Sequence, residues 1–183
     1  MKIAVLGSHP ATKRQAPFDD PDWKIWACSP HNFEHGLLPR VDEWFEVHQP
    51  ALCEKTRVAS YQEFVRSLVR EDGPYGKIPV WVRDKNEHPD ALDYPEKEMK
   101  EKYGGGNFHF PFTSSIAYII AKAIAEKPEE IGLWGVMQAS EGEYAYQRPG
   151  IQFLMQMAHD EGINITLPVV AVKNLWEMPE EQW

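Results

Sequence analysis

Short apolar runs recur along this chain, and each is bounded by glycine, proline or polar residues. A run of this length and composition is typical of a β-strand buried on both faces, as strands of parallel sheets are. Helical patterns separate several of the runs. The predicted strands are Lys2–Leu6, Lys24–Cys28, Trp44–His48, Ile78–Val82, Ile131–Gly135 and Asn164–Leu167.

Strands that alternate with helices favour a mostly parallel sheet with right-handed crossovers and helices on both faces. We therefore predict an α/β fold, a Rossmann-like three-layer domain with a mostly parallel sheet of about six strands. The 183 residues suit one domain, 1–183, with a variable insertion or flap at about 83–106. That segment is charged and poor in core residues, and it predicts a short helix from about Pro95 to Tyr103 that ends at a triple glycine.

Three further helices carry apolar stripes at helical spacing. In the first, Ser60 and Glu63 predict a capping box at the helix start. In the second, hydroxyl residues precede a stripe that begins at Ile116. In the third, Pro149 suits the first turn and Gly162 the C′ position. The stripes are Tyr61, Phe64, Val65, Leu68 and Val69; Ile116, Ile119, Ile120, Ala123 and Ile124; and Ile151, Leu154, Met155 and Ala158.

Composition excludes several classes of protein. A formal charge of −9 argues against a protein that binds nucleic acid by neutralising phosphates, although a local basic pocket for a small anion stays compatible with it. The two cysteines, Cys28 and Cys53, have neither disulfide nor metal-site spacing, which favours a reducing cytosol. We expect no signal peptide and no membrane span, hence a cytoplasmic protein.

The carboxyl ends of the predicted strands carry small or hydrogen-bonding residues, and ligands of open α/β sheets bind at those ends. Gly7, Ser8 and His9 follow the first strand, Asn32 follows the second, and His48 ends the third. Gly135 ends the fifth. Because His9 and His48 each come just past a strand, both are candidate general bases, although a lone histidine is more often structural.

Two neighbouring segments predict an anion site. Thr113, Ser114 and Ser115 precede a helix, where backbone N–H groups and hydroxyls together can hold a phosphate or carboxylate, or simply cap the helix. After the next strand we predict a polar loop in which Tyr144 and Tyr146, two residues apart in extended backbone, point to the same side.

Gln147 and Arg148 adjoin these tyrosines. Tyrosine hydroxyls and an arginine can hold phosphate oxygens in charge-assisted hydrogen bonds. Alternatively, the rings cover a neighbouring helix and Arg148 pairs with Glu141 or Glu143.

Known fingerprints are missing. The chain has no G-x-G-x-x-G, no P-loop and no H-E-x-x-H, and we predict no metal site. Without a G-x-S-x-G elbow a serine hydrolase has little support. The acidic group Asp19, Asp20 and Asp22 has the oxygen ligands that a divalent cation needs, but a solvated turn is the commoner explanation.

The order of these motifs, from GSHP and WACSPHN through WFEVH and FTSSIAYIIAKAI to IGLWGV and EYAYQRPG, resembles small Rossmann-like proteins of tailed phages. It is more distantly similar to bacterial sialyltransferases that use CMP-activated sugars, and to the 6-hydroxymethylpterin pyrophosphokinase-like and motility-glycosylation families. The sialyltransferase resemblance implies that Ser114 and Ser115 contact a nucleotide, that Tyr144 and Tyr146 hold its phosphate, and that Asn32 lies on the nucleotide side.

These observations lead to a nucleotide- or nucleotide-sugar-binding protein of glycosyltransferase type, whose ligand would be a small anion and whose base would be His9 or His48. The related families usually carry an acidic residue where this chain has Val136 and Met137. A non-catalytic module that senses or sequesters a nucleotide is therefore an alternative, as is a phage accessory or assembly protein. The resemblance also implies a phage-infected bacterial cell as the setting, and the oligomeric state stays open.

Overall fold

A single seven-stranded sheet organises the computed structural model, which describes residues 1–48, 54–86, 88–105, 110–136 and 143–168. The strand order is β5-β4-β3-β2-β1-β6-β7, and every neighbouring pair is parallel. The strands are β1 (Lys2–Leu6), β2 (Trp23–Cys28), β3 (Glu43–Glu46), β4 (Val80–Val82), β5 (Leu92–Asp93), β6 (Glu130–Trp134) and β7 (Asn164–Thr166).

The predicted α/β class is confirmed, with one strand more than the expected six. The extra strand, β5, has only two residues, Leu92 and Asp93, and both are exposed. A strand this short shows no alternation of apolar and polar residues, so pattern alone does not predict it.

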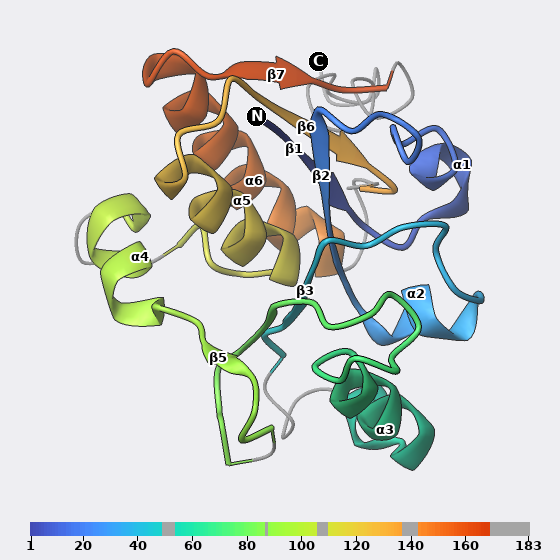
Figure 1. Cartoon of the computed structure of the whole chain (residues 1–183). Coiled ribbons are helices and arrows are strands. Elements are labelled where there is room, and N and C mark those ends of the chain that lie inside the picture. Colours follow the sequence, from blue (N-terminus) through green and yellow to red (C-terminus); the bar gives the residue numbers. More distant parts are fainter. Residues whose placement is uncertain (49–53, 87, 106–109, 137–142, 169–183) are drawn as a thin grey trace.

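Helices cover both faces of the sheet (Figure 1). One core lies between the sheet and α4, α5 and α6, and the other lies mainly between the sheet and α3. Within β1, Ile3 and Val5 belong to the first core, whereas Ala4 and Leu6 belong to the second, as the two-residue period of a strand requires. The helices are α1 (Pro10–Lys13), α2 (Pro30–Glu34), α3 (Ala59–Ser67), α4 (Glu96–Tyr103), α5 (Ser115–Ala125) and α6 (Glu143–Asp160), with a 3₁₀ turn η1 (Glu54–Arg57).

The helix α5 is buried far beyond the predicted stripe. Ala117, Tyr118, Ala121 and Lys122 are also buried, because α5 packs against the sheet, α4 and α6 at once. The ammonium group of Lys122 pairs with Glu126 and lies over the ring of Trp81, so its charge is satisfied at the edge of the core.

Two predicted helix starts are wrong. The helix α3 has Val58 at its N-cap position and no side-chain cap, so Ser60 and Glu63 form no capping box. The helix α6 begins at Glu143, which places Pro149 inside it. Proline removes one hydrogen bond from a helix interior, but residues 143–148 are mostly good helix formers and extend the helix beyond that position. The predicted end is confirmed, because Gly162 has a φ of +82° and its N–H binds the carbonyl of His159.

The segment 83–106 supplies more to the core than its composition suggests. Tyr94, Met99 and Tyr103 are buried in the core beside α5. Arg83 binds Glu96 through two hydrogen bonds of 2.6 and 2.8 Å, and its guanidinium lies over the ring of Tyr118. The predicted helix is present as α4, which ends at Gly104.

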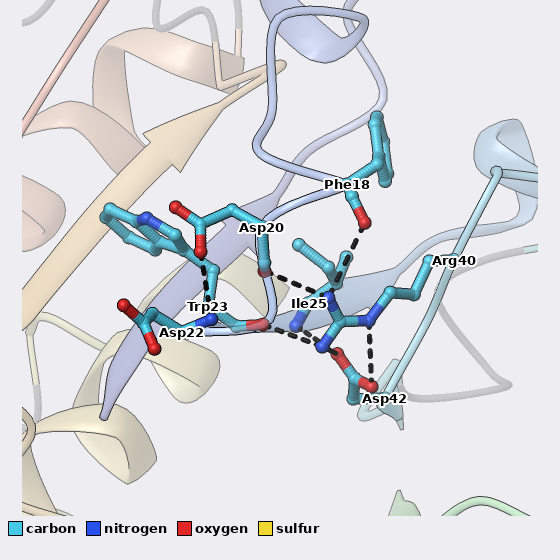
Figure 2. Close-up of polar contacts among 7 residues, drawn as sticks. All are labelled: Phe18, Asp20, Asp22, Trp23, Ile25, Arg40 and Asp42. Atoms are coloured by element: carbon cyan, nitrogen blue, oxygen red, sulfur yellow. Dashed lines mark hydrogen bonds and ion pairs between the residues drawn. The ribbon is translucent and has the colours of Figure 1, made fainter.

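At the amino ends of β2 and β3, Arg40 ties three chain segments together (Figure 2). Its guanidinium forms a bidentate pair with Asp42, at 3.2 and 2.9 Å, and donates to the carbonyls of Phe18, Asp20 and Trp23. The Asp42 carboxylate also accepts the backbone N–H of Ile25 at 2.7 Å. The polar groups before these two strands therefore satisfy one another.

Candidate functional site

At the carboxyl end of the sheet, β3 and the start of α5 meet through their side chains. His48, two residues beyond β3, places Nε2 3.0 Å from Oγ of Ser115, the first residue of α5. Ser114 is the N-cap of this helix, and its hydroxyl oxygen accepts the N–H of Ala117 at 3.2 Å. One of the two predicted bases thus lies beside the predicted hydroxyl-rich helix start.

A buried carboxylate orients the His48 ring. Oε1 of Glu46 lies 2.8 Å from His48 Nδ1 and also accepts the His48 backbone N–H at 3.2 Å. The hydroxyl of Tyr61, on α3, donates to Oε2 of the same carboxylate. Burial, reinforced by the Glu46 charge, raises the pKa of Tyr61 well above its usual value, so this phenol stays a proton donor.

These contacts indicate which nitrogen of the neutral His48 ring carries the proton. Because a carboxylate only accepts, Nδ1 of His48 carries the proton toward Glu46. Nε2 is then the acceptor, and the Ser115 hydroxyl donates to it. A small hollow of about 20 Å³ lies beside these hydrogen-bonded side chains and has room for one water molecule. It is lined in part by Glu46, His48, Gln62 and Val82.

A buried lysine at the end of α1 was not predicted. Lys13 is 8% exposed, and its Nζ donates to Oδ1 of Asn32 at 3.1 Å. No described carboxylate lies within ion-pair distance of this ammonium group. Burial, and then the nearby charge of Arg14, lowers the pKa of Lys13.

Asn32 is held by the loops around it. Its Nδ2 donates to the carbonyl of Cys28 at 2.7 Å and to that of Gly7 at 3.3 Å, and its Oδ1 faces Lys13. It therefore joins the ends of β1 and β2 and fixes the lysine. Asn32 as a nucleotide contact stays a prediction, and these bonds give it a structural role as well.

The glycines that end β1 and β6 face each other. A Cβ on Gly7 would lie 2.3 Å from the carbonyl oxygen of Gly135, and one on Gly135, whose φ is +65°, would lie 2.5 Å from that of Gly7. The N–H of Gly135 donates to Oγ1 of Thr12 at 2.7 Å. These glycines permit two loops to approach each other, and Ser8, half-buried, follows directly.

His9, the other predicted base, caps a helix. It is exposed, and its Nδ1 accepts the backbone N–H of Ala11 at 3.3 Å at the start of α1. No described carboxylate orients its ring. Of the two histidines, only His48 has a described carboxylate that orients its ring, as the base of a catalytic group does.

The predicted tyrosine loop is wrong, because residues 143–148 are the first turns of α6. Positions two apart on a helix lie about 200° apart around its axis, so 144 and 146 do not share a side. The side chain of Tyr144 lies outside the described residues, and Tyr146 is 79% exposed. Gln147 and Arg148, which follow, are half-buried.

The backbone of this region still lies beside the start of α5. Oγ1 of Thr113 donates to the carbonyl of Tyr146 at 3.4 Å. A Cβ on Gly150 would lie 2.5 Å from the carbonyl oxygen of Pro111, which shows how closely the two segments pack. The two predicted parts of the anion site are therefore neighbours, but in a different geometry from the expected one.

Within the described ranges, no group of three or more His, Cys, Asp or Glu residues could hold a metal ion. Asp20 serves the Arg40 cluster instead, because its carboxylate accepts the N–H of Asp22 and its carbonyl binds Arg40. Among the same residues, no helix has the length and apolar composition to cross a membrane.

Sequence reasoning missed Glu46, Tyr61 and Lys13. Glu46 is a charged residue in an otherwise apolar strand, and such a residue needs a partner when buried, so it was a detectable signal. Tyr61 resembled an ordinary stripe residue of α3. Lys13 carried no signal, because only the fold buries it.

Comparison with known proteins agrees with the fold. No protein-family model and no curated protein sequence matches the chain. Among solved structures, a monofunctional α-2,3-sialyltransferase, Cst-I from Campylobacter jejuni, superimposes with a TM-score of 0.64 at 16% identity, covering 97% of this chain and 79% of that one. The sialyltransferase CstII from the same organism, in complex with CMP, gives 0.61 at 17% identity, covering 95% and 83%. The chain thus shares the fold of these sialyltransferases.

Proposed function

We propose that this protein binds a nucleotide or nucleotide-sugar at the carboxyl edge of its sheet and acts as a glycosyltransferase-type enzyme. The hydrogen bond between Ser115 and His48 carries the proposal, because it joins the helix start that would hold the phosphate to an oriented base. The shared fold supports it, since CstII is a sialyltransferase with CMP bound.

The residues at this edge suit an anionic leaving group. The first N–H groups of α5 have no intrahelical partner and favour negative charge. Lys13 adds a buried cation that has no described carboxylate to neutralise it. A buried charge of this kind is unfavourable unless a partner arrives, and a phosphate would be such a partner.

In the proposed reaction, the acceptor hydroxyl attacks the sugar carbon while His48 Nε2 takes its proton. Glu46 holds the imidazole in the required tautomer and stabilises its charged form. The bond between the sugar carbon and the phosphate oxygen breaks, and the departing phosphate would be stabilised by the helix N–H groups and by Lys13. Thr113, Ser114, Tyr146 and Arg148 stay candidate ligand contacts.

Calorimetric titration with CMP, UMP and their sugar conjugates tests the proposal. We expect binding by at least one nucleotide, weakened about tenfold or more by Lys13→Met, since charge-assisted hydrogen bonds contribute about 1.5–3 kcal/mol. The matched control is Lys77→Met, which removes an exposed lysine just before β4, at the amino edge of the sheet and not at the carboxyl edge. Lack of binding by every nucleotide at millimolar concentration would refute the proposal.

A nucleotide-sensing or sequestering module is the second candidate. The chain has Val136 and Met137 after Gly135, and Val136 is buried and apolar, whereas the families that the sequence resembles usually carry an acidic residue there. Such a module would bind the nucleotide sugar and return it unchanged after prolonged incubation. Chromatography of the ligand after incubation with excess protein separates the two candidates.

A further inference from the structure

Three side chains at the carboxyl edge form a continuous hydrogen-bonded chain from a carboxylate to a hydroxyl. Glu46 contacts His48 Nδ1 at 2.8 Å, and His48 Nε2 contacts Ser115 Oγ at 3.0 Å. Both distances lie within the range for a nucleophile, its base and the group that orients the base. We propose that Ser115 is an activated nucleophile, and that this protein cleaves carboxylic esters through an acyl-serine intermediate.

The geometry, and not a sequence motif, carries this proposal. Nucleophile–base–carboxylate chains occur on unrelated folds and in different orders along the sequence, so the lack of a G-x-S-x-G elbow does not exclude one. Here the order is Glu46, His48, Ser115. Tyr61 anchors the far oxygen of the carboxylate, which holds Glu46 in the position that orients the imidazole.

Groups that stabilise an oxyanion lie at the same helix start. The backbone N–H groups of Ser115 and Ile116 begin α5, and they donate to no described residue. Free N–H groups next to a nucleophile are what the tetrahedral intermediate of acyl transfer requires. Ser115 and His48 are each partly exposed, so a substrate can reach them.

The reaction balances with water as the co-reactant. Oγ of Ser115 bonds to the ester carbonyl carbon while its proton passes to His48 Nε2. The bond from that carbon to the alkoxy oxygen breaks, and the alcohol leaves with the proton from His48. Water then attacks the acyl-serine, gives one proton to His48 and releases the carboxylic acid. The proton returns from His48 to Ser115.

Labelling with a fluorophosphonate probe and hydrolysis of p-nitrophenyl acetate test this inference. We expect one label per chain, mapped to Ser115 by mass spectrometry, and none in Ser115→Ala. The His48→Gln variant should lower both rates about 100-fold or more. The matched control is Ser60→Ala, which removes an exposed serine hydroxyl on α3 and should label like the wild type.

Failure to label Ser115 in the folded wild-type chain, or equal labelling of Ser115 and Ser60, overturns the inference. Mapping the label in the wild type keeps the test valid even where a variant fails to fold. The inference does not depend on nucleotide binding. If Ser115 is labelled but no nucleotide binds, the acyl-serine is supported and only the proposed transferase is refuted. If a nucleotide binds but Ser115 is not labelled, the acyl-serine is refuted and the proposed transferase is unaffected.

Discussion

The cationic side chain at the amino ends of β2 and β3 has an anionic partner, whereas the cationic side chain near their carboxyl ends has none among the described residues. At the amino ends, the guanidinium of Arg40 is matched by Asp42 and by three backbone carbonyls (Figure 2). At the carboxyl ends, the ammonium of Lys13 has one described acceptor, the neutral amide of Asn32. In the same region, Nε2 of His48 forms a hydrogen bond with one hydroxyl group, that of Ser115. The charge at the first end is satisfied within the fold, whereas at the second end no described carboxylate pairs with Lys13.

The largest difference between the two ends should appear in His48→Gln. We expect turnover of a nucleotide sugar to fall about 100-fold or more, because general-base catalysis contributes about 10²–10⁴-fold. The free energy of unfolding, measured with urea, should fall by no more than about 1–2 kcal/mol, since Glu46 keeps Tyr61 and the backbone N–H of residue 48 as donors. A large loss of stability with retained turnover would show that His48 stabilises the fold and does not act as a base.

At the other end, Arg40→Ala should act on stability alone. It leaves Asp42 and three carbonyls without their donor, so we expect a loss of about 2–3 kcal/mol in urea unfolding. Arg70→Ala is the matched control, because Arg70 is about half exposed and its pair with Glu63 should contribute less than about 1 kcal/mol. Equal effects of the two substitutions would contradict the role assigned to Arg40.

Tyr61→Phe tests whether the orienting carboxylate needs its second anchor. The change removes one donor from buried Glu46, which should cost about 1–2 kcal/mol in stability. Turnover should also fall, but less than in His48→Gln, because the bond between Glu46 and His48 remains. The control is Tyr75→Phe, whose hydroxyl accepts the N–H of Leu38 away from the site. Unchanged turnover in Tyr61→Phe would show that Tyr61 is only structural.

The smallest expected effect belongs to Lys13→Met, and the informative quantity is how the stability of this variant changes with pH. Burial lowers the pKa of Lys13, so the folded state disfavours the charged form. This penalty is complete below the folded pKa and disappears as the pH rises toward the ordinary pKa of lysine. We expect the variant to lose the alkaline rise in stability that the wild type shows, because it has no group with a lowered pKa at this position. Thermal unfolding across pH 7–11 measures this rise, and a rise of the same size in the variant would contradict an unmatched charge at Lys13.

The fold was more predictable than the site. The apolar run Lys2–Leu6 and the apolar stripe of α5 predicted a strand and a helix correctly. In a parallel sheet covered by helices, the spacing of apolar residues follows the residues that are buried. The start of α6 was mispredicted, because proline is favoured in a first turn and disfavoured in a helix interior, yet Pro149 lies inside α6. Lys13 and Tyr61 gained their roles only from neighbours distant in the sequence.

One consequence follows from the contact between Gly7 and Gly135. Each backbone occupies the space that a side chain on the other would need, and further hydrogen bonds join the two loops. The ends of β1 and β6 are therefore immobilised against each other. A molecule bound at the carboxyl edge would therefore meet, at the ends of β1 and β6, a surface whose shape is already set before the molecule arrives.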